Sequence, residues 1–416
     1  MEEKMKTLVL FAAMMLATVS FTTSCSSDDG PSQSTVNITC STPSDIEILE
    51  VSNLKITFTD VTSGKSQSFN LPRLQVVNDP TFVVTEGLYD IDVEGDATYM
   101  DGMEKVSSVI RANKKGVSIT GDAFQLSLDA YVSKITSGFV FSELFFAGTV
   151  KPDGDRYQDD AYIRITNNSD VTLYADGLFI AESEFQSDMN EYDTASPDVR
   201  NNATPVGYLT VLPGSGTDYP VAPGESILVA INAINHQTTE LNPNSFDLTK
   251  ANFEIFNESS RPEVYQDVDN PAVPNTKDVY TQSATVWTPH VRGVKSYIIG
   301  RLGVSADQWL TDYTYNYTYK FVFGEYSFDM DGEAMQVPNA WISDAVNVAP
   351  KDQYTYPVIS ATLDKGYAWY SEVGFDENRL GKGIRRKFAD GKLVDTNDSS
   401  NDFESHVEAN PFYVFK

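Results

Sequence analysis

Two clusters of side chains have residue types and spacings that could bind a ligand. The first is an aromatic segment that follows Trp309, in which four tyrosines alternate with other residues: Tyr313, Tyr315, Tyr317 and Tyr319. In an extended strand this spacing places the four phenol rings on one face. A row of phenols beside a tryptophan suits flat aromatic or sugar ligands. The alternative is a cross-strand aromatic ladder inside a core, which the same spacing would produce.

The second cluster is basic. Six of the thirty positive residues occupy one short interval: Arg379, Lys382, Arg385, Arg386, Lys387 and Lys392. A local positive patch on an acidic protein attracts compact anions. The alternative is structural, because Asp395 and Asp398 follow closely and could pair with these arginines.

Residues for catalysis or metal binding are few. The chain has three histidines and two cysteines, too few for a zinc cluster or a disulfide scaffold. The Gly214–Gly216 segment lacks the Gly-x-Ser-x-Gly frame of a hydrolase nucleophile. His290 lies between Trp287 and Arg292 with no second histidine nearby, so we expect a pocket or surface side chain. We therefore predict no enzyme activity, no catalytic residues, no metal ligands and no cofactor.

Composition and charge limit the partners. With 41% hydrophobic and 12% aromatic residues, the 416-residue chain can bury a core in each of two or three domains. Its 30 basic and 59 acidic residues give a net charge of −29. Such a chain repels phosphate backbones and anionic membrane surfaces, so nucleic acid is not an expected partner.

The N-terminus resembles a bacterial lipoprotein signal. Lys4 and Lys6 precede an apolar run, and small residues lead to Cys25. Residues 1–24 are predicted to be a signal peptide, with Cys25 as the lipid-attachment site. Residues 25–35 are predicted to be an acidic tether, similar to the surface-export signal of Bacteroidota lipoproteins. The expected location is the outer membrane at the cell surface, with attachment through lipid alone.

Period-two alternation predicts an all-β chain. Residues 54–59, 87–95 and 124–128 alternate apolar and polar side chains, which is typical of half-buried strands. The stretch 36–133 resembles prealbumin-like accessory domains, which implies an antiparallel sandwich. Cys40 is expected to be a small core residue there.

The rest of the chain, residues 134–416, resembles an immunoglobulin-like lamin-tail domain. The resemblance rests on the strand-like segments 137–146, 160–169 and 173–178 and on the Pro-Gly turn and strand of 223–230. It implies a second sandwich with large insertions, around 186–205, 257–295 and 303–320. Long loops on a rigid scaffold commonly carry binding sites.

Taken together, these features resemble the xenosiderophore-utilisation lipoproteins of Bacteroidota. The resemblance rests on the lipid cysteine, the acidic tether, the two sandwiches and segments such as 337–347. It implies capture of a ferric catecholate siderophore and its transfer to a TonB-dependent outer-membrane transporter, with iron present only as part of the ligand. Aromatic rings and cations would hold such a ligand, and the predicted contact residues are Trp287, Arg292, Trp309, Tyr313, Tyr315, Tyr317, Arg385 and Arg386.

Two other functions stay open. In a glycan-binding or adhesive surface protein, the same aromatic side chains would stack on sugar rings and the basic run would be structural. A surface hydrolase working through paired carboxylates ranks third, because 59 acidic residues supply many accidental pairs.

Overall fold

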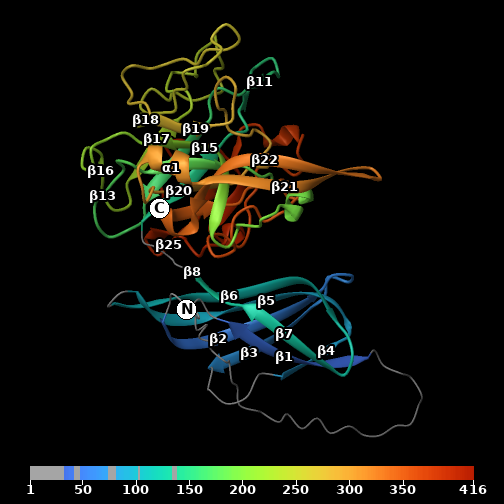
Figure 1. Cartoon of the computed structure of the whole chain (residues 1–416). Coiled ribbons are helices and arrows are strands. Elements are labelled where there is room, and N and C mark those ends of the chain that lie inside the picture. Colours follow the sequence, from blue (N-terminus) through green and yellow to red (C-terminus); the bar gives the residue numbers. More distant parts are fainter. Residues whose placement is uncertain (1–31, 42–46, 74–80, 102–103, 134–137) are drawn as a thin grey trace. The chain divides into compact units, whose positions relative to one another are not determined.

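The computed structural model describes residues 32–41, 47–73, 81–101, 104–133 and 138–416. The predicted signal peptide, Cys25 and residues 26–31 of the tether lie outside this part. The chain divides into two compact units, residues 1–134 and residues 135–416. Both consist mainly of strands (Figure 1), so the predicted all-β fold class is confirmed. In the described part of the chain, no helix combines the length and apolar character needed to cross a membrane.

Unit 1 is a small sandwich of two sheets. Its described strands are β1 (Gln33–Ser41), β2 (Glu47–Asp60), β3 (Ser66–Arg73), β4 (Thr81–Thr85), β5 (Gly87–Asp101), β6 (Glu104–Ile119), β7 (Ala123–Asp129) and β8 (Tyr131–Ser133). One sheet has the order β4-β1-β7 and the other the order β3-β2-β5-β6-β8. Strand β1 begins at Gln33, so the last residues assigned to the tether belong to this sandwich.

Alternation along the strands builds the core of unit 1. In β1, buried residues alternate with partly exposed ones, and the residues of β5 that were expected on one face, Tyr89, Ile91 and Val93, are all buried. Cys40 is buried in the same cluster, as predicted. Burying this apolar face between two sheets is the main force that stabilises the unit.

Unit 2 is a larger sandwich. Its six-stranded sheet has the order β18 (Phe253–Glu254), β17 (Ser226–Ala230), β12 (Tyr162–Asn167), β9 (Phe139–Phe145), β24 (Lys382–Arg386) and β27 (Phe403–Glu408). The facing sheet has the order β21 (Thr314–Phe323), β22 (Tyr326–Pro338), β15 (Ala203–Val211), β14 (Phe179–Ser183), β20 (Tyr297–Gly300) and β23 (Ile342–Val346), with β19 (Lys277–Thr281) also pairing with β15.

The core of unit 2 contains side chains from both sheets. Phe141 and Ile163 of the six-stranded sheet share one buried cluster with Ile180 and Ile299 of the facing sheet. Every residue of β9 is buried, because this strand lies in the middle of its sheet with both faces covered. These sheets form the rigid frame from which the loops of unit 2 extend.

Short elements complete unit 2. They are the strand pairs β10 (Thr149–Val150) with β11 (Arg156–Tyr157), β13 (Leu173–Tyr174) with β16 (Pro220–Val221), and β25 (Phe388–Ala389) with β26 (Lys392–Leu393), the helices α1 (Ala306–Asp312) and α2 (Ser399–Asp402), and the 3-10 turns η1 (Asn190–Thr194), η2 (Asn339–Trp341) and η3 (Glu377–Arg379).

The predicted insertions have different fates in the structure. Residues 257–295 are mostly irregular, with β19 as their regular element. The stretch 303–320, by contrast, was wrongly predicted as an inserted loop. It forms α1 and most of β21, because the alternating tyrosines pair with β22 along the sheet. The first insertion holds η1 and then leads into β15.

Candidate functional site

The predicted aromatic contact residues of β21 lie in the interior of unit 2. Tyr315 and Tyr317 are 3% and 6% exposed and pack with Phe185 in a small core cluster. Their hydroxyls donate hydrogen bonds, Tyr315 to the carbonyl oxygen of Pro197 at 2.7 Å and Tyr317 to Oε1 of Glu184 at 2.9 Å. The aromatic-ladder alternative therefore describes these two residues better than ligand binding does.

Trp309 and Tyr313 also serve the fold. Trp309 is fully buried in α1, and its Nε1 donates to the carbonyl oxygen of Gln336 at 2.9 Å. Tyr313 packs against Trp341, with ring centroids 5.0 Å apart. Both residues help to join α1 to the sheet that contains β21 and β22. The indole N–H of Trp309 and the ring of Tyr313 already have partners within the protein.

The two arginines predicted from the basic run are buried ion-pair partners. Arg385 donates from Nε to Oε2 of Glu143 at 2.8 Å, and Arg386 donates from Nη2 to Oδ2 of Asp344 at 2.7 Å. The side chain of Arg386 is only 1% exposed. The salt-bridge alternative therefore accounts for both side chains. An acidic partner from the Asp395 segment does contact Arg386, at 3.4 Å, but the main carboxylates come from distant strands.

Arg292 instead lines an open pocket with a cationic wall. We call it the cationic pocket; its volume is about 470 Å³ and its lining residues are Arg156, Gln158, Thr288, Pro289, His290, Val291, Arg292, Phe375 and Arg379. Three of these side chains are arginines, and none of the described lining residues is acidic. In a chain of net charge −29 this is a local reversal of sign.

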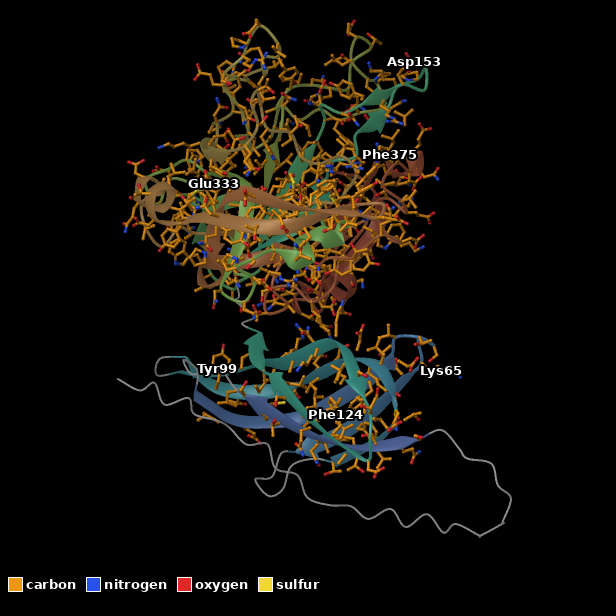
Figure 2. All side chains as sticks on the ribbon, turned by 45° about the vertical axis from the view of Figure 1, so that its right-hand side comes forward. Lys65, Tyr99, Phe124, Asp153, Glu333 and Phe375 are labelled. Carbon is orange, nitrogen blue, oxygen red and sulfur yellow. The ribbon has the colours of Figure 1, made fainter. Side chains whose placement is uncertain are left out.

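An exposed ring forms part of the pocket. Figure 2 shows Phe375 at the outer surface of unit 2, and its side chain is 78% exposed. The guanidinium carbon of Arg292 lies 4.9 Å from the centroid of this ring. The stacking fixes the plane of the guanidinium group while leaving charge available to a ligand.

The other two arginines are held differently. Arg379, in η3, is 2% exposed, and its Nε donates to the carbonyl oxygen of Val291 at 3.1 Å. Arg156, in β11, is exposed and pairs with Glu377 at 2.7 Å. Carbonyl oxygens orient Arg379 without cancelling its charge, so the pocket keeps a net positive wall.

His290 contributes a neutral imidazole. Burial, followed by the nearby charges of Arg292 and Lys295, lowers the pKa of His290 to about 4. Its Nε2 lies 3.4 Å from Nη2 of Arg292, which can only donate, so we assign the ring proton to Nδ1. Nδ1 is buried and has no hydrogen-bond partner among the described residues.

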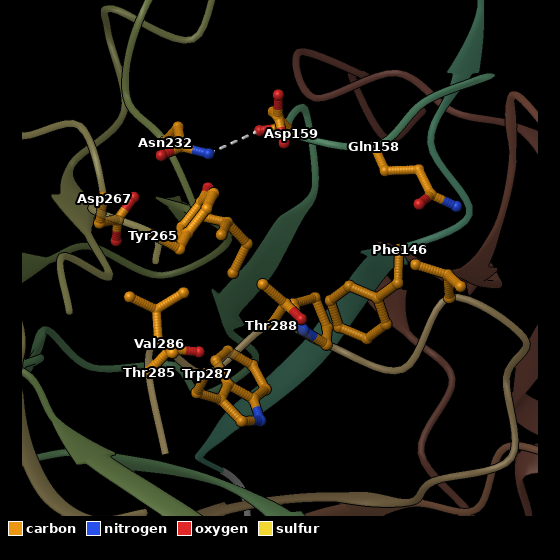
Figure 3. Close-up of a pocket in the computed structure, with 13 residues that line it drawn as sticks. Phe146, Gln158, Asp159, Asn232, Tyr265, Asp267, Thr285, Val286, Trp287 and Thr288 are labelled. Carbon is orange, nitrogen blue, oxygen red and sulfur yellow. Dashed lines mark hydrogen bonds between the residues drawn. The ribbon is translucent and has the colours of Figure 1, made fainter. Parts of the chain in front are cut away.

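A second pocket adjoins the first, and we call it the aromatic pocket. Figure 3 shows its lining, with Trp287 and Thr288 near one another and Asn232 bonded to the backbone of Asp159 at 3.1 Å. Its volume is about 310 Å³. Gln158, Thr288, Pro289 and Val291 line both pockets. One segment, residues 285–292, thus supplies wall to each of them.

The aromatic pocket is lined by a stacked ring and by acidic and amide groups. The ring of Trp287 stacks on Tyr208, with centroids 4.0 Å apart and an interplanar angle of 1°. Asp267 accepts backbone hydrogen bonds from Asn257 and Val268, and burial raises the pKa of its carboxyl group. The Oδ1 atom of Asn232 is buried without a hydrogen-bond partner in the described part of the chain.

One buried carboxylate supports both pockets. Glu182, in β14, accepts hydrogen bonds from Nε1 of Trp287 and from the backbone N–H of His290, each at 3.3 Å. It also accepts the hydroxyl of Tyr297 at 2.8 Å. Burial raises the pKa of Glu182, and the charge of Lys295 opposes that rise. Glu182 therefore ties the 285–292 segment to the sheet.

Of the eight predicted contact residues, the structure places Trp287 and Arg292 in these adjoining pockets. Sequence reasoning missed Arg156 and Phe375, and it named Arg379 only as part of the basic run. One signal was available in the sequence: Trp287, His290 and Arg292 lie within six positions of one another. It did not show which residues from distant segments would line the pockets with them. Among the described residues, no group of three or more His, Cys, Asp or Glu side chains could hold a metal ion.

The C-terminal part of the chain matches a known family model. Residues 222–410 match DUF4876, a family described as protein of unknown function. This stretch includes most of both pockets, among them Arg292, Phe375 and Arg379. No curated protein matches the chain.

Two solved structures from Bacteroides are similar to the chain. A DUF4876 family protein from Bacteroides thetaiotaomicron is 22% identical, with a TM-score of 0.52, over 91% of this chain and 96% of that one. This likeness supports the fold. A candidate adhesin from Bacteroides ovatus is 9% identical with a TM-score of 0.18, over 76% of this chain and 88% of that one. That likeness is too low to support any inference.

Proposed function

We propose that the protein is a non-catalytic, lipid-anchored surface protein that captures a ferric catecholate siderophore. In this proposal it passes the complex to a TonB-dependent outer-membrane transporter. The observation that supports the ligand class is the cationic pocket, whose wall contains three arginines and an exposed phenylalanine on a body of net charge −29. The family match and the Bacteroides fold neighbour are consistent with a Bacteroidota surface protein.

The chemistry of the pocket suits this ligand. A ferric tris-catecholate is a bulky anion with flat aromatic faces, so it needs cations together with an apolar ring. Arg292 can supply charge-assisted hydrogen bonds to the catecholate oxygens, and the buried Arg379 adds positive charge behind the pocket wall. Phe375 offers an exposed face for stacking. The iron arrives already coordinated, so capture requires no metal ligand from the protein.

The binding test compares complexes that differ in charge. Equilibrium dialysis with a purified ferric tris-catecholate should show saturable binding, whereas the iron-free siderophore and a neutral ferric trihydroxamate should bind much more weakly. Mass analysis should recover the siderophore intact. Equal binding of the neutral complex would contradict a cationic site, and a cleaved siderophore would make the protein an enzyme.

A matched pair of variants locates the site. Phe375→Ser removes the exposed ring of the pocket, and Phe412→Ser removes another exposed phenylalanine of unit 2 that does not line it. Binding of the ferric catecholate should weaken only in Phe375→Ser, because only this ring stacks on Arg292. Equal affinities of the two variants would place the ligand elsewhere.

Anchoring has its own test. Cys25 is the proposed lipid-attachment site, and Asp28 and Asp29 belong to the proposed export signal. Membrane fractionation of Cys25→Ala should find the protein in the soluble fraction. Neutralising both aspartates should leave the protein lipidated but less accessible to added protease. Cys25→Ala that stays in the membrane pellet would contradict the lipoprotein proposal.

Glycan capture is the second candidate, and the aromatic pocket favours it. Carboxylates such as Asp159 and Asp267 accept hydrogen bonds from sugar hydroxyls, and the partly exposed ring of Tyr265 offers a stacking surface. A panel of polysaccharides distinguishes the two functions. Saturable glycan binding that Tyr265→Ala abolishes, with no binding of ferric catecholates, would replace siderophore capture as the proposed function.

A further inference from the structure

The hairpin of β21 and β22 has one aromatic face along its whole length. Residues directly opposite each other in the two strands share a face, and the register pairs Tyr319 with Met330, Phe321 with Phe328 and Phe323 with Tyr326. We define the hairpin aromatic face by these side chains and the two tyrosines nearer its base: Tyr315, Tyr317, Tyr319, Phe321, Phe323, Tyr326, Phe328 and Met330.

The base of this face is core and its tip is surface. Tyr315 and Tyr317 are buried, Tyr319 and Phe321 are half-buried, and Phe323 and Tyr326 are 72% and 70% exposed. Figure 1 shows β21 and β22 running out beyond the rest of unit 2. The outer part of the hairpin therefore contributes little to the buried core of unit 2.

Regular strand pairing continues to the tip of the hairpin. Phe323 and Tyr326 form the last pair of the ladder, and Gly324 between them has φ of 60°, a conformation that glycine adopts without strain. The rings of Tyr326 and Phe328 stack with centroids 6.5 Å apart. The exposed rings thus form one continuous apolar surface on a regular hairpin.

The opposite face of the hairpin and its turn are acidic. Between Thr314 and Pro338 the sequence contains one lysine, Lys320, and four acids: Glu325, Asp329, Asp331 and Glu333. The net charge is thus 1 − 4 = −3. All four acids are exposed, and Lys320 pairs with Asp329 across the strands.

This combination identifies the kind of partner. Exposed apolar patches rimmed by polar residues mark interaction sites, because leaving such rings in water costs solvation free energy. The acids repel anionic lipid headgroups, and a second copy would bring the same charges together. A partner surface that complements both the exposed rings and the acidic side chains has an apolar groove with basic residues along its border.

We propose that the hairpin tip, Val322–Met330, is a docking surface for a protein partner that presents an apolar groove bordered by lysine or arginine. The aromatic rings would enter the groove, and the basic border would extend around the hairpin to reach Glu325 at the turn and Asp329 and Asp331 on the opposite face. This interaction does not depend on which ligand the pockets hold.

Photo-cross-linking of the full-length protein in its native cells tests the proposal. A benzophenone amino acid at position 323 should give one major adduct with another protein. The cross-linked peptide of that partner should contain apolar residues flanked by lysine or arginine. The double variant Tyr326→Ser/Phe328→Ser should reduce the adduct at least about tenfold, because central aromatic residues carry much of the energy of an interface.

Charge reversal and a matched control complete the experiment. Asp329→Lys/Asp331→Lys should also reduce the adduct, whereas Phe412→Ser, an exposed ring outside the hairpin, should leave it unchanged. All variants should keep the wild-type melting temperature, because the altered residues are exposed. Cross-linking to a second copy, to lipid or to another part of the same chain would overturn the proposal. So would no adduct, or an adduct that the variants leave unchanged.

Discussion

Two groups of arginines in unit 2 differ in what lies around the charge. Arg385 and Arg386 are buried neighbours in β24, and Glu143 and Asp344 meet them at hydrogen-bond distance. Arg292 and Arg379 lie at the cationic pocket, where an aromatic ring and carbonyl oxygens fix their orientation. A carboxylate partner neutralises the charge of the arginine within the fold. A neutral ring or carbonyl orients the guanidinium group but leaves its positive charge to attract a ligand. The environment, and not the density of basic residues in the sequence, separates the two roles.

The largest expected effect comes from removing a paired arginine. Arg386→Met leaves the buried carboxylates of Asp344 and Asp402 without their cation, which should lower the free energy of unfolding by about 3–5 kcal/mol. Urea denaturation measures the loss.

The control removes an exposed pair. Lys392 contacts Asp170 at 2.9 Å with both side chains largely in solvent, so Lys392→Met should cost less than about 1 kcal/mol. If Arg386→Met proved as stable as this control, the buried pair would not be a structural requirement.

The pocket arginine should show the opposite behaviour. Arg292→Gln should weaken binding of a ferric catecholate about tenfold, because a charged hydrogen-bond donor is lost, while the free energy of unfolding changes by less than about 0.5 kcal/mol. Isothermal titration and thermal melting report the two quantities separately. A large loss of stability with normal affinity would move Arg292 into the structural group.

Salt should separate the two groups further. Affinity for an anionic ligand at the open pocket should fall several-fold as ionic strength rises from about 0.05 to about 0.5 M, because exposed charges are screened. The difference in unfolding free energy between wild type and a mild variant of the buried pair, Arg386→Lys, should hardly change, since buried pairs are screened much less. If the ligand affinity and this difference in unfolding free energy changed equally with salt, the pocket arginines and the buried arginines would not differ in their exposure to solvent.

A pH-dependent effect is expected at His290. Its pKa is lowered from 6.5 to about 4 in the folded protein, so the folded state binds fewer protons than the unfolded state between these values. The resulting contribution to stability is fully present above pH 6.5 and is lost as the pH falls towards 4. Wild type should therefore lose more stability than His290→Gln between pH 7 and pH 4.5. Parallel melting curves for the two proteins over this range would contradict that placement of the histidine.

The sequence predicted the strands well because burial of one face leaves a period-two pattern. Tyr89, Ile91 and Val93 show this pattern, and all three are buried in unit 1. Alternation also places Tyr315 and Tyr317 on one face, but it cannot say what covers that face. In the structure Phe185 covers it, from a segment more than a hundred residues away.

The site was harder to predict because its parts are distant in the sequence. Arg156, Arg292 and Phe375 come from three separate segments and meet only through the packing of loops on the sandwich. The main partners of the buried arginines are also distant in the sequence: Glu143 is 242 positions from Arg385, and Asp344 is 42 positions from Arg386. A dense basic run was thus the visible signal, although it mostly marks a strand that pairs inside the fold.

The walls shared by the two pockets concentrate specificity in one short piece of chain. Residues 285–292 line both cavities and are held to the sheet by Glu182, which does not itself line either pocket. Exchange of this eight-residue segment between homologous proteins could therefore alter ligand preference while leaving the sheets untouched. In protein engineering, ligand selectivity can be varied by replacing this segment alone. The two sheets and Glu182, which holds the segment in place, would stay unchanged.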